Sequence, residues 1–452
     1  MTARRIASVT AVGLIAAAQC CAPPAQAITP LPIDNSRLPA PALPAAPQST
    51  EQRDMCAVPG RSRAAAPAAN PLHALDLSAM WRLTRGEGQR VAVIDTGVNR
   101  HPRLAHLEGG GDYVATGDGT QDCDGHGTIV AGIIAAAPDP EDRVGFAGLA
   151  PAATVISIRQ SSTKFGPTDD PSITGFGDVD TMAMAVRTAA DLGATVINIS
   201  SVACAAGALD DRALGAALAY AVDVKDVVVV AAAGNVGGAS QCPKQPDDPE
   251  LSWDTATVAV SPAWYDDYVL TVGAIGPDGS PSSFSLAGPW VDVAAPGEGM
   301  VSLNPAGTGL VDGVTAFDRE IPISGTSYAA PVVSGLAALV RARFPELTAR
   351  QVMERIEASA HRRAGGWSPV VGNGTIDPLA AISTESTGTG VQDPPTDGRP
   401  LAVPATHPVA TGRSSHRIAL LGAGLCAAVA AGALGLSAAR SRRNLRRDVA
   451  GD

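Results

Sequence analysis

The sequence predicts an α/β fold in which helices cover both faces of a mostly parallel central sheet, a three-layer arrangement. Continuous apolar runs of strand length recur along the middle of the chain, and helix-length stretches separate several of them, as is typical of parallel sheets buried on both sides. Asp95 follows the first run and Asn235 follows the fourth, at strand ends where sites in such folds lie. The runs are Val91–Ile94, Thr154–Ile158, Val196–Ile199, Val227–Ala231, Val269–Val272 and Val291–Ala294, and the helix-length stretches are Gly127–Ala137, Val179–Leu192 and Ala208–Val222.

The first 27 residues are predicted to be a signal peptide. The basic pair Arg4–Arg5 precedes the apolar stretch Ile6–Ala18, and the small residues of Ala25–Ala27 supply a cleavage site after residue 27. A lipid anchor on Cys20 or Cys21 is the alternative, although a glutamine precedes Cys20 where a small residue is needed. The pattern favours export of the mature chain.

The exported part is expected to contain an arm, a domain and a linker. Residues 28–74 are rich in Pro and Ala without amphipathic period, so we expect an extended arm that lies on the surface of the next domain. Residues 75–383 hold the strand and helix pattern and form the predicted main domain. Residues 384–417 are rich in Pro, Gly and Thr and are expected to be a linker.

A membrane anchor is predicted near the C-terminus. Residues 418–439 are 22 residues without a charge, which is long enough to cross a bilayer core of roughly 30 Å. The tail, residues 440–452, contains five arginines, so the positive-inside rule places it in the cytosol and the domain at 75–383 outside. A buried helix of the domain is the alternative. The preferred prediction is a single-pass type I protein of the cell membrane.

Charge and cysteine content limit the classes of function. The net charge of −11 argues against a nucleic-acid partner, because phosphate contacts require Lys and Arg. Exported cysteines favour disulfides, and four of them allow three pairings. We favour Cys56–Cys123, which would fix the arm, and Cys204–Cys242, which would close a surface loop; free thiols are the alternative. No CxxC pair is present to hold zinc, and we expect no metal and no cofactor.

Four short motifs supply an acid, an imidazole, an amide and a hydroxyl group. They are Val91–Gly97 with Asp95, Asp124–Thr128 with His126, Ala233–Asn235, and Gly325–Pro331 with Ser327. A serine hydroxyl becomes a nucleophile when a histidine base is within reach and an acid fixes the tautomer of that base. The motifs therefore predict a serine hydrolase.

Each of these residues lies where its role requires. Ser327 opens an apolar helix, Ser327–Phe344, with Pro331 in the first turn, so its hydroxyl lies at the positive end of the helix dipole. His126 begins a helix after a glycine, and Asp95 at a buried strand end needs a partner such as His126. Asn235 could donate its side-chain amide to an oxyanion. Taken singly, the same residues could be helix caps, a turn residue and a surface histidine.

The order Asp, His, Ser of these motifs resembles the subtilisin-like (S8, subtilase) serine proteases. The resemblance covers about Leu75 to Leu379 and implies a serine endopeptidase that cleaves protein or peptide substrates through an acyl-enzyme. It also implies that Ser200, Ser201 and Val202 form the edge that pairs with substrate. Many subtilases have Gly where Val202 stands, so we expect narrow specificity or a different mode of binding.

The order of segments along the whole chain narrows this resemblance. This order resembles that of the mycosins, the membrane-anchored subtilases of type VII secretion systems. It consists of a signal peptide, a Pro-rich arm with a cysteine, a subtilase domain, a linker, a single span and a basic tail. The segment Trp81–Gly86 before the first strand is similar to that family too. The resemblance implies membrane-embedded secretion components as partners. The alternative function is a structural subunit of the secretion complex whose proteolytic activity is dispensable.

Overall fold

The computed structural model describes residues 28–57, 70–142, 144–237, 242–246, 250–316 and 319–384. All of them belong to the first of two compact units, Met1–Gly388; the second unit is Thr389–Asp452. The predicted signal peptide, the predicted span at 418–439 and the basic tail lie outside the described residues, as does nearly all of the predicted linker.

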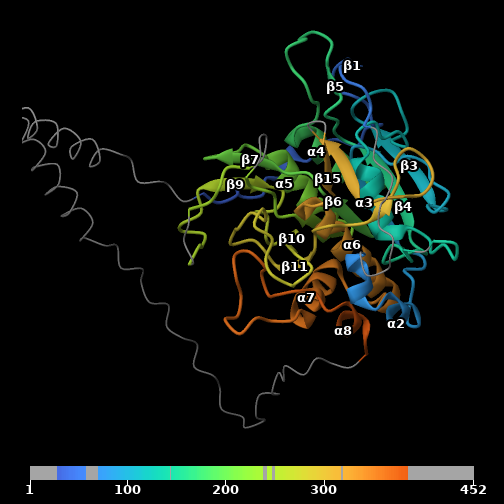
Figure 1. The fold of residues 1–452 in the computed structure, drawn as a ribbon. Helices are drawn as coiled ribbons and strands as arrows, with labels where there is room; N and C mark the ends of the chain where they lie inside the picture. The colour runs from blue at the N-terminus through green and yellow to red at the C-terminus, as the bar shows by residue number, and fades with distance from the viewer. Residues whose placement is uncertain are drawn as a thin grey trace, which may run out of the picture. The chain divides into compact units, whose positions relative to one another are not determined.

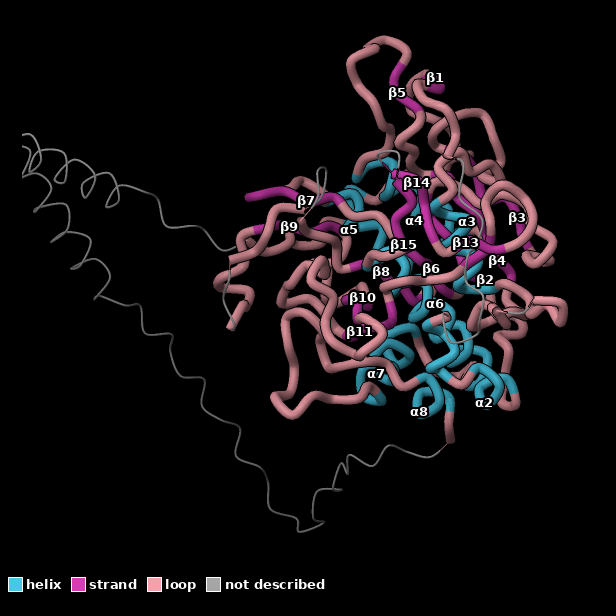
Figure 2. Tube along the Cα trace, viewed as in Figure 1, coloured by secondary structure: helices cyan, strands magenta, loops and turns pink. Residues whose placement is uncertain are grey.

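A seven-stranded sheet forms the centre of the domain, and every neighbouring pair in it is parallel (Figures 1 and 2). The strand order is β11-β10-β8-β6-β2-β4-β3. The strands are β2 (Arg90–Asp95), β3 (Leu107–Asp112), β4 (Thr154–Arg159), β6 (Val196–Ile199), β8 (Val228–Ala232), β10 (Leu270–Ile275) and β11 (Val293–Pro296). The chain leaves β2 toward β3 and later passes to β6 on the other side of β2. The carboxyl end of β2 is therefore the topological switch point where α/β folds place their sites.

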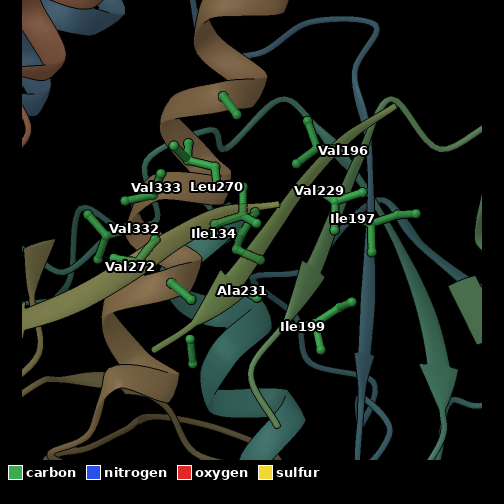
Figure 3. Close-up of a cluster of buried hydrophobic side chains, with 14 of the residues drawn as sticks. Ile134, Val196, Ile197, Ile199, Val229, Ala231, Leu270, Val272, Val332 and Val333 are labelled. Atoms are coloured by element: carbon green, nitrogen blue, oxygen red, sulfur yellow. The ribbon is translucent and has the colours of Figure 1, made fainter. Parts of the chain in front are cut away.

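Two helix layers cover the sheet and bury its strands. α3 (His126–Ala135) and α6 (Thr326–Arg343) pack against each other on one face, and α4 (Val179–Asp191) and α5 (Arg212–Ala219) pack together on the other. All five residues of β8 and all four of β6 are buried, as expected for strands covered on both sides. Figure 3 shows Ile134, Val332 and Val333 of the first helix pair beside Leu270 and Val272 of the sheet. The predicted three-layer α/β fold is thus confirmed.

Helix boundaries follow local chemistry at several ends. A capping box begins α4, in which Asp178 accepts from the Thr181 amide and the Thr181 side chain accepts from the Asp178 amide. Thr348 caps α7 (Ala349–Ser359) in the same way. The predicted helix at 208–222 begins later than expected, at Arg212, and α5 ends at Ala219, where a π-helix, η4 (Tyr220–Val224), continues it. The remaining short helices are η1 (Asn35–Arg37), η3 (Pro71–Leu75), α2 (Leu77–Trp81) and α8 (Pro378–Ile382).

Four antiparallel pairs of short strands lie outside the central sheet. The arm contributes β1 (Thr50–Gln52), which pairs with β5 (Phe165–Pro167) of the domain. The others are β7 (Ala203–Ala206) with β9 (Val258–Ser261), β12 (Ser302–Leu303) with β13 (Leu310–Val311), and β14 (Gly313–Ala316) with β15 (Arg319–Pro322). The arm thus lies along the domain through backbone hydrogen bonds.

None of the helices in the described residues has both the length and the apolar character needed to cross a bilayer. The C-terminal transmembrane helix of the predicted fold falls at 418–439, outside those residues.

Candidate active site

Asp95 and His126 meet at the switch point. Asp95 is the last residue of β2 and His126 is the first of α3, and His126 Nδ1 lies 2.7 Å from Asp95 Oδ1. The same carboxylate oxygen accepts from the Thr96 amide at 2.7 Å. The helix approaches closely because Gly127 has no side chain; a Cβ there would lie 2.0 Å from the Gly97 carbonyl oxygen. The two motifs therefore bring acid and imidazole into contact, as the sequence predicts.

The surroundings of His126 set its protonation. Burial lowers the pKa of the imidazole, but the neighbouring Asp95 carboxylate, with help from Asp122 and Asp124, outweighs burial and raises this pKa above its usual value. A carboxylate accepts and does not donate, so it favours the tautomer with the proton on Nδ1. The other ring nitrogen, Nε2, is then left as an acceptor. The His126 side chain is 28% exposed and that of Asp95 only 2%, so the imidazole reaches the surface while the carboxylate is enclosed.

Ser327 and Asn235 come together at the start of α6. Ser327 is the second residue of the helix and is 9% exposed. Asn235 Oδ1 accepts from the Thr326 amide at 2.9 Å and from the Thr326 hydroxyl at 3.2 Å, which leaves the Asn235 amide nitrogen as a donor. A Cβ on Gly325 would lie 3.1 Å from Ser327 Oγ and 3.6 Å from Asn235 Nδ2. Hydroxyl and amide therefore border the same small space, which glycine keeps open.

One cleft of about 600 Å³ contains all four predicted chemical groups. Asp95, His126, Asn235 and Ser327 line it, and so does the predicted substrate edge Ser200–Val202. The arm reaches the cleft through Ala57, and the β14 strand does so through Val314. The open volume next to the hydroxyl is large enough to take a peptide segment.

Both favoured disulfides are present in the structure. Cys204 and Cys242 line this cleft, and Cys56–Cys123 joins the residues next to Ala57 and Asp124, which also line it. Cys56–Cys123 joins the arm to the turn that precedes His126. Cys204–Cys242 joins β7 to the segment after Asn235, and the Cys242 amide donates to the Asn235 carbonyl oxygen at 2.9 Å. Each bridge therefore ties a wall of the cleft to a chain segment that carries one of the predicted site residues.

Comparison with known proteins agrees with this geometry. The model of the subtilase family (peptidase S8) matches residues 86–374. Mycosin-4 of Mycobacterium tuberculosis (strain ATCC 25618 / H37Rv) is 60% identical over 440 residues, which cover 95% of each chain. The chain belongs to the subtilase family, in its mycosin branch. Mycosin-1 of the same organism is 44% identical over 439 residues, which cover 93% of this chain and 96% of that protein.

Two solved structures show the same fold. The MycP3 protease from the type VII (ESX-3) secretion system matches with a TM-score of 0.73 and 45% identity over 79% of this chain and 100% of that chain. A chain of an intact ESX-5 inner membrane complex matches with a TM-score of 0.74 and 40% identity over 91% of this chain and 100% of that chain. As a subtilase of the mycosin branch, the chain is a serine peptidase.

Sequence reasoning missed three contacts that shape this subtilase site. The Tyr328 ring packs on the His126 ring with centroids 5.1 Å apart. Asp122 is buried and accepts from Thr96 and from the first turn of α3, and burial raises its pKa to about 6. Asp124 accepts from the Thr163 amide at 2.7 Å and so ties the segment before β5 to the His126 turn. The adjacent Asp-rich sequence was the available signal for Asp122 and Asp124; Tyr328 gave none, because its contact spans two elements.

The predicted substrate edge has a different character at each position. Ser200 is 6% exposed, and its hydroxyl donates to the Ser327 carbonyl oxygen at 2.8 Å. Ser201 is half-buried, and no partner for its hydroxyl occurs among the described residues. Val202 lies near Gly234, where a Cβ would be 3.5 Å from a Val202 methyl group. Its branched side chain therefore narrows the cleft beside Asn235.

Proposed function

We propose that this chain is a membrane-anchored, extracytoplasmic serine endopeptidase with Asp95, His126 and Ser327 as its catalytic residues and Asn235 as an oxyanion donor. The observation that carries this proposal is the 2.7 Å contact between His126 and Asp95 in the one cleft that also contains Ser327 at a helix start. The subtilase family and the mycosin relatives support it.

The reaction follows from the placement of these groups. Ser327 Oγ attacks the carbonyl carbon of the scissile peptide bond while His126 Nε2 accepts the hydroxyl proton. The developing oxyanion receives a hydrogen bond from Asn235 Nδ2, a donor of the kind worth roughly 3–4 kcal/mol in transition-state stabilisation. His126 then protonates the leaving amine, and a water molecule activated by the same nitrogen hydrolyses the acyl-enzyme. Asp95 orients the imidazole and stabilises its charged form.

Substrate is proposed to lie along Ser200, Ser201 and Val202. The backbone of this segment follows β6 and leads into β7 at the edge of the cleft, where an extended peptide can add its hydrogen bonds to a strand. Val202 beside Asn235 limits the size of the substrate side chain next to the scissile bond. A protein or peptide with a small residue there fits this space.

The proposed setting is a type VII secretion system. The 45%-identical MycP3 protease belongs to such a system, and the 40%-identical neighbour is a chain of an ESX-5 inner membrane complex. The chain covers those neighbours fully, so the surfaces by which they assemble have counterparts here. Membrane-embedded secretion components are therefore its proposed partners.

The proposed anchor is residues 418–439, with the signal peptide at 1–27, the arm at 28–74, the peptidase domain at 75–383, the linker at 384–417 and the tail at 440–452. The uncharged run and the five arginines after it support a type I orientation. The periplasmic assembly of the ESX-5 inner membrane complex contains a 41%-identical chain, which supports an extracytoplasmic peptidase domain.

Replacement of Ser327 tests the catalytic proposal. Ser327→Ala is expected to lower kcat for a cleaved protein substrate by a factor on the order of 10⁴ or more, because the nucleophile is lost. The melting temperature should stay near that of the unaltered protein, since only one oxygen is removed. Undiminished turnover by the purified variant would contradict the assignment.

The same variant separates the proposal from a scaffold function. In cells whose only copy carries Ser327→Ala, loss of secretion supports proteolysis as the required activity. If secretion persists in that strain and stops when the gene is deleted, the structural role is the primary one. Both results are compatible with the chain being a component of the secretion complex.

A further inference from the structure

The carbonyl oxygen of Ser327 lacks the hydrogen bond that a helix normally supplies. In an α-helix this carbonyl would accept from the amide of residue 331, but residue 331 is a proline and has no N–H. Pro331 was expected in the first turn, where it would be harmless. Pro331 is the sixth residue of α6, which begins at Thr326, so it lies beyond the first four residues, whose amides have no partner within the helix, and removes a bond.

A chain of side chains replaces the missing donor. The Ser200 hydroxyl donates to the Ser327 carbonyl oxygen at 2.8 Å, and Asn198 Nδ2 donates to Ser200 Oγ at 2.9 Å. At the far end, the Ser334 hydroxyl donates to Asn198 Oδ1 at 2.8 Å. Every hydrogen along this chain points in one direction, from Ser334 toward the carbonyl of Ser327.

Burial makes this hydrogen-bond chain costly unless it is complete. Asn198 and Ser334 are 0% exposed, and Asn198 interrupts the otherwise apolar strand β6. A buried amide without partners is strongly destabilising, whereas one with both its donor and its acceptor satisfied is tolerated. Asn198 is satisfied on both sides, by Ser200 at the carboxyl end of β6 and by Ser334 of α6. It therefore fixes the helix relative to the sheet at a defined register.

We propose that Asn198 is a positioning residue that acts on Ser327 through Ser200. It holds the Ser200 hydroxyl toward the Ser327 carbonyl, and this bond sets the backbone of the first turn of α6 from which Ser327 Oγ projects. This inference rests on the proposed function, because it treats Ser327 as the nucleophile. Ser334 orients Asn198 and so acts on Ser327 through one more hydrogen bond than Asn198 does.

The test uses reaction rate and backbone protection as independent readouts. Asn198→Val keeps a strand-forming side chain and removes both hydrogen bonds. It is expected to slow labelling of Ser327 by a fluorophosphonate, and kcat for peptide cleavage, by roughly tenfold while KM changes little. Ser334→Ala should give a smaller loss. In both variants, amide hydrogen exchange of residues 326–330 should be faster than in the unaltered protein.

Ser157→Ala is the matched control, because Ser157 is also fully buried and its hydroxyl donates to the Gly119 carbonyl oxygen at 2.6 Å. It should lower the melting temperature and leave labelling unchanged. An equal loss of labelling in this control, or wild-type labelling and exchange in a folded Asn198→Val protein, would overturn the proposal. If Asn198→Val does not fold, Ser334→Ala decides by the same two readouts.

A rescue experiment tests the mechanism directly. Ser200→Ala removes the last donor, and Pro331→Ala in the same chain supplies an amide that can donate to the Ser327 carbonyl within the helix. The double variant is expected to regain part of the labelling rate and of the exchange protection that Ser200→Ala loses. No regain of protection would overturn the role assigned to this carbonyl. Amide exchange does not require turnover, so it tests the hydrogen-bond chain independently of activity. If the unaltered protein is neither labelled by the fluorophosphonate nor able to cleave peptides, the proposed function is rejected, and the exchange measurement still tests the hydrogen-bond chain.

Discussion

At the scale of single residues, His126 links the site to the pH of its surroundings. The imidazole must be neutral to accept the Ser327 proton. Burial lowers its pKa, but the Asp95 carboxylate more than compensates, and the pKa lies above its ordinary value near 6.5. The base is therefore protonated and inactive over a wider acidic range than a free histidine would be.

We accordingly predict an acid limb of kcat/KM that lies above pH 6.5, with activity lost as the pH falls through the raised pKa. Asp122, whose pKa is raised to about 6, titrates nearby, so the imidazole itself should be followed by NMR in the Ser327→Ala protein. Agreement between the midpoint of the acid limb of kcat/KM and the midpoint of the imidazole titration assigns this limb to His126. A profile that stays flat down to pH 4 would rule out a histidine base.

The residues of the site were predictable where the chemistry is local to a motif. Asp95, His126, Asn235 and Ser327 stand in glycine-containing turns at the ends of strands or the starts of helices, so their neighbourhood in sequence indicates their role. The Asn198–Ser334 bond joins residues 136 positions apart. No local pattern encodes such a contact, and an Asn inside an apolar strand has a meaning only once the helix above it is known.

At the scale of elements, the strands predicted as continuous apolar runs are those of the sheet centre. β3 was not predicted, because its sequence Leu107–Asp112 contains three glycines and lies at the sheet edge, where packing demands are weakest. The hairpin β14–β15 lay in a long loop rich in Gly and Pro and was likewise not predicted. Strands of this kind are held mainly by backbone hydrogen bonds and so leave little trace in residue type.

The arm is the element for which a stability effect can be predicted. Its β1 strand pairs with β5, and Cys56–Cys123 closes a loop with a sequence separation of 67. In the chain-entropy model, a bridge of this length contributes about 4 kcal/mol by restricting the unfolded state. We predict that replacing both cysteines with serine lowers the free energy of unfolding in guanidinium by an amount of this order. The arm should also become sensitive to protease.

The matched control is the pair Cys204→Ser and Cys242→Ser, which removes a bridge of similar effect on the unfolded chain without releasing the arm. It should lower stability and leave the arm protected from protease. An arm that stays protected without Cys56–Cys123 would show that the β1–β5 pairing alone holds it.

At the scale of the whole molecule, the order of segments carries the functional setting. The peptidase domain supplies all four predicted chemical groups of the cleft, since Asp95, His126, Asn235 and Ser327 all lie between residues 95 and 327. The proposed signal peptide precedes this domain in the sequence, and the proposed span follows it. The residues proposed to catalyse the reaction and the segments proposed to fix the chain in the membrane are therefore separate in the sequence. We expect that either can be removed without loss of the other.

We predict that a chain truncated before Ile418 is exported, is released from the membrane and keeps the kcat/KM of the full-length protein. The full-length chain should fractionate with membranes, because 22 uncharged residues stop transfer and the five arginines after them resist translocation. In intact cells, an impermeant reagent should label cysteines introduced on the domain surface and should not label a cysteine introduced after Arg440. Labelling of the tail with protection of the domain would reverse the orientation, and with it the proposal that cleavage takes place outside the cytosol.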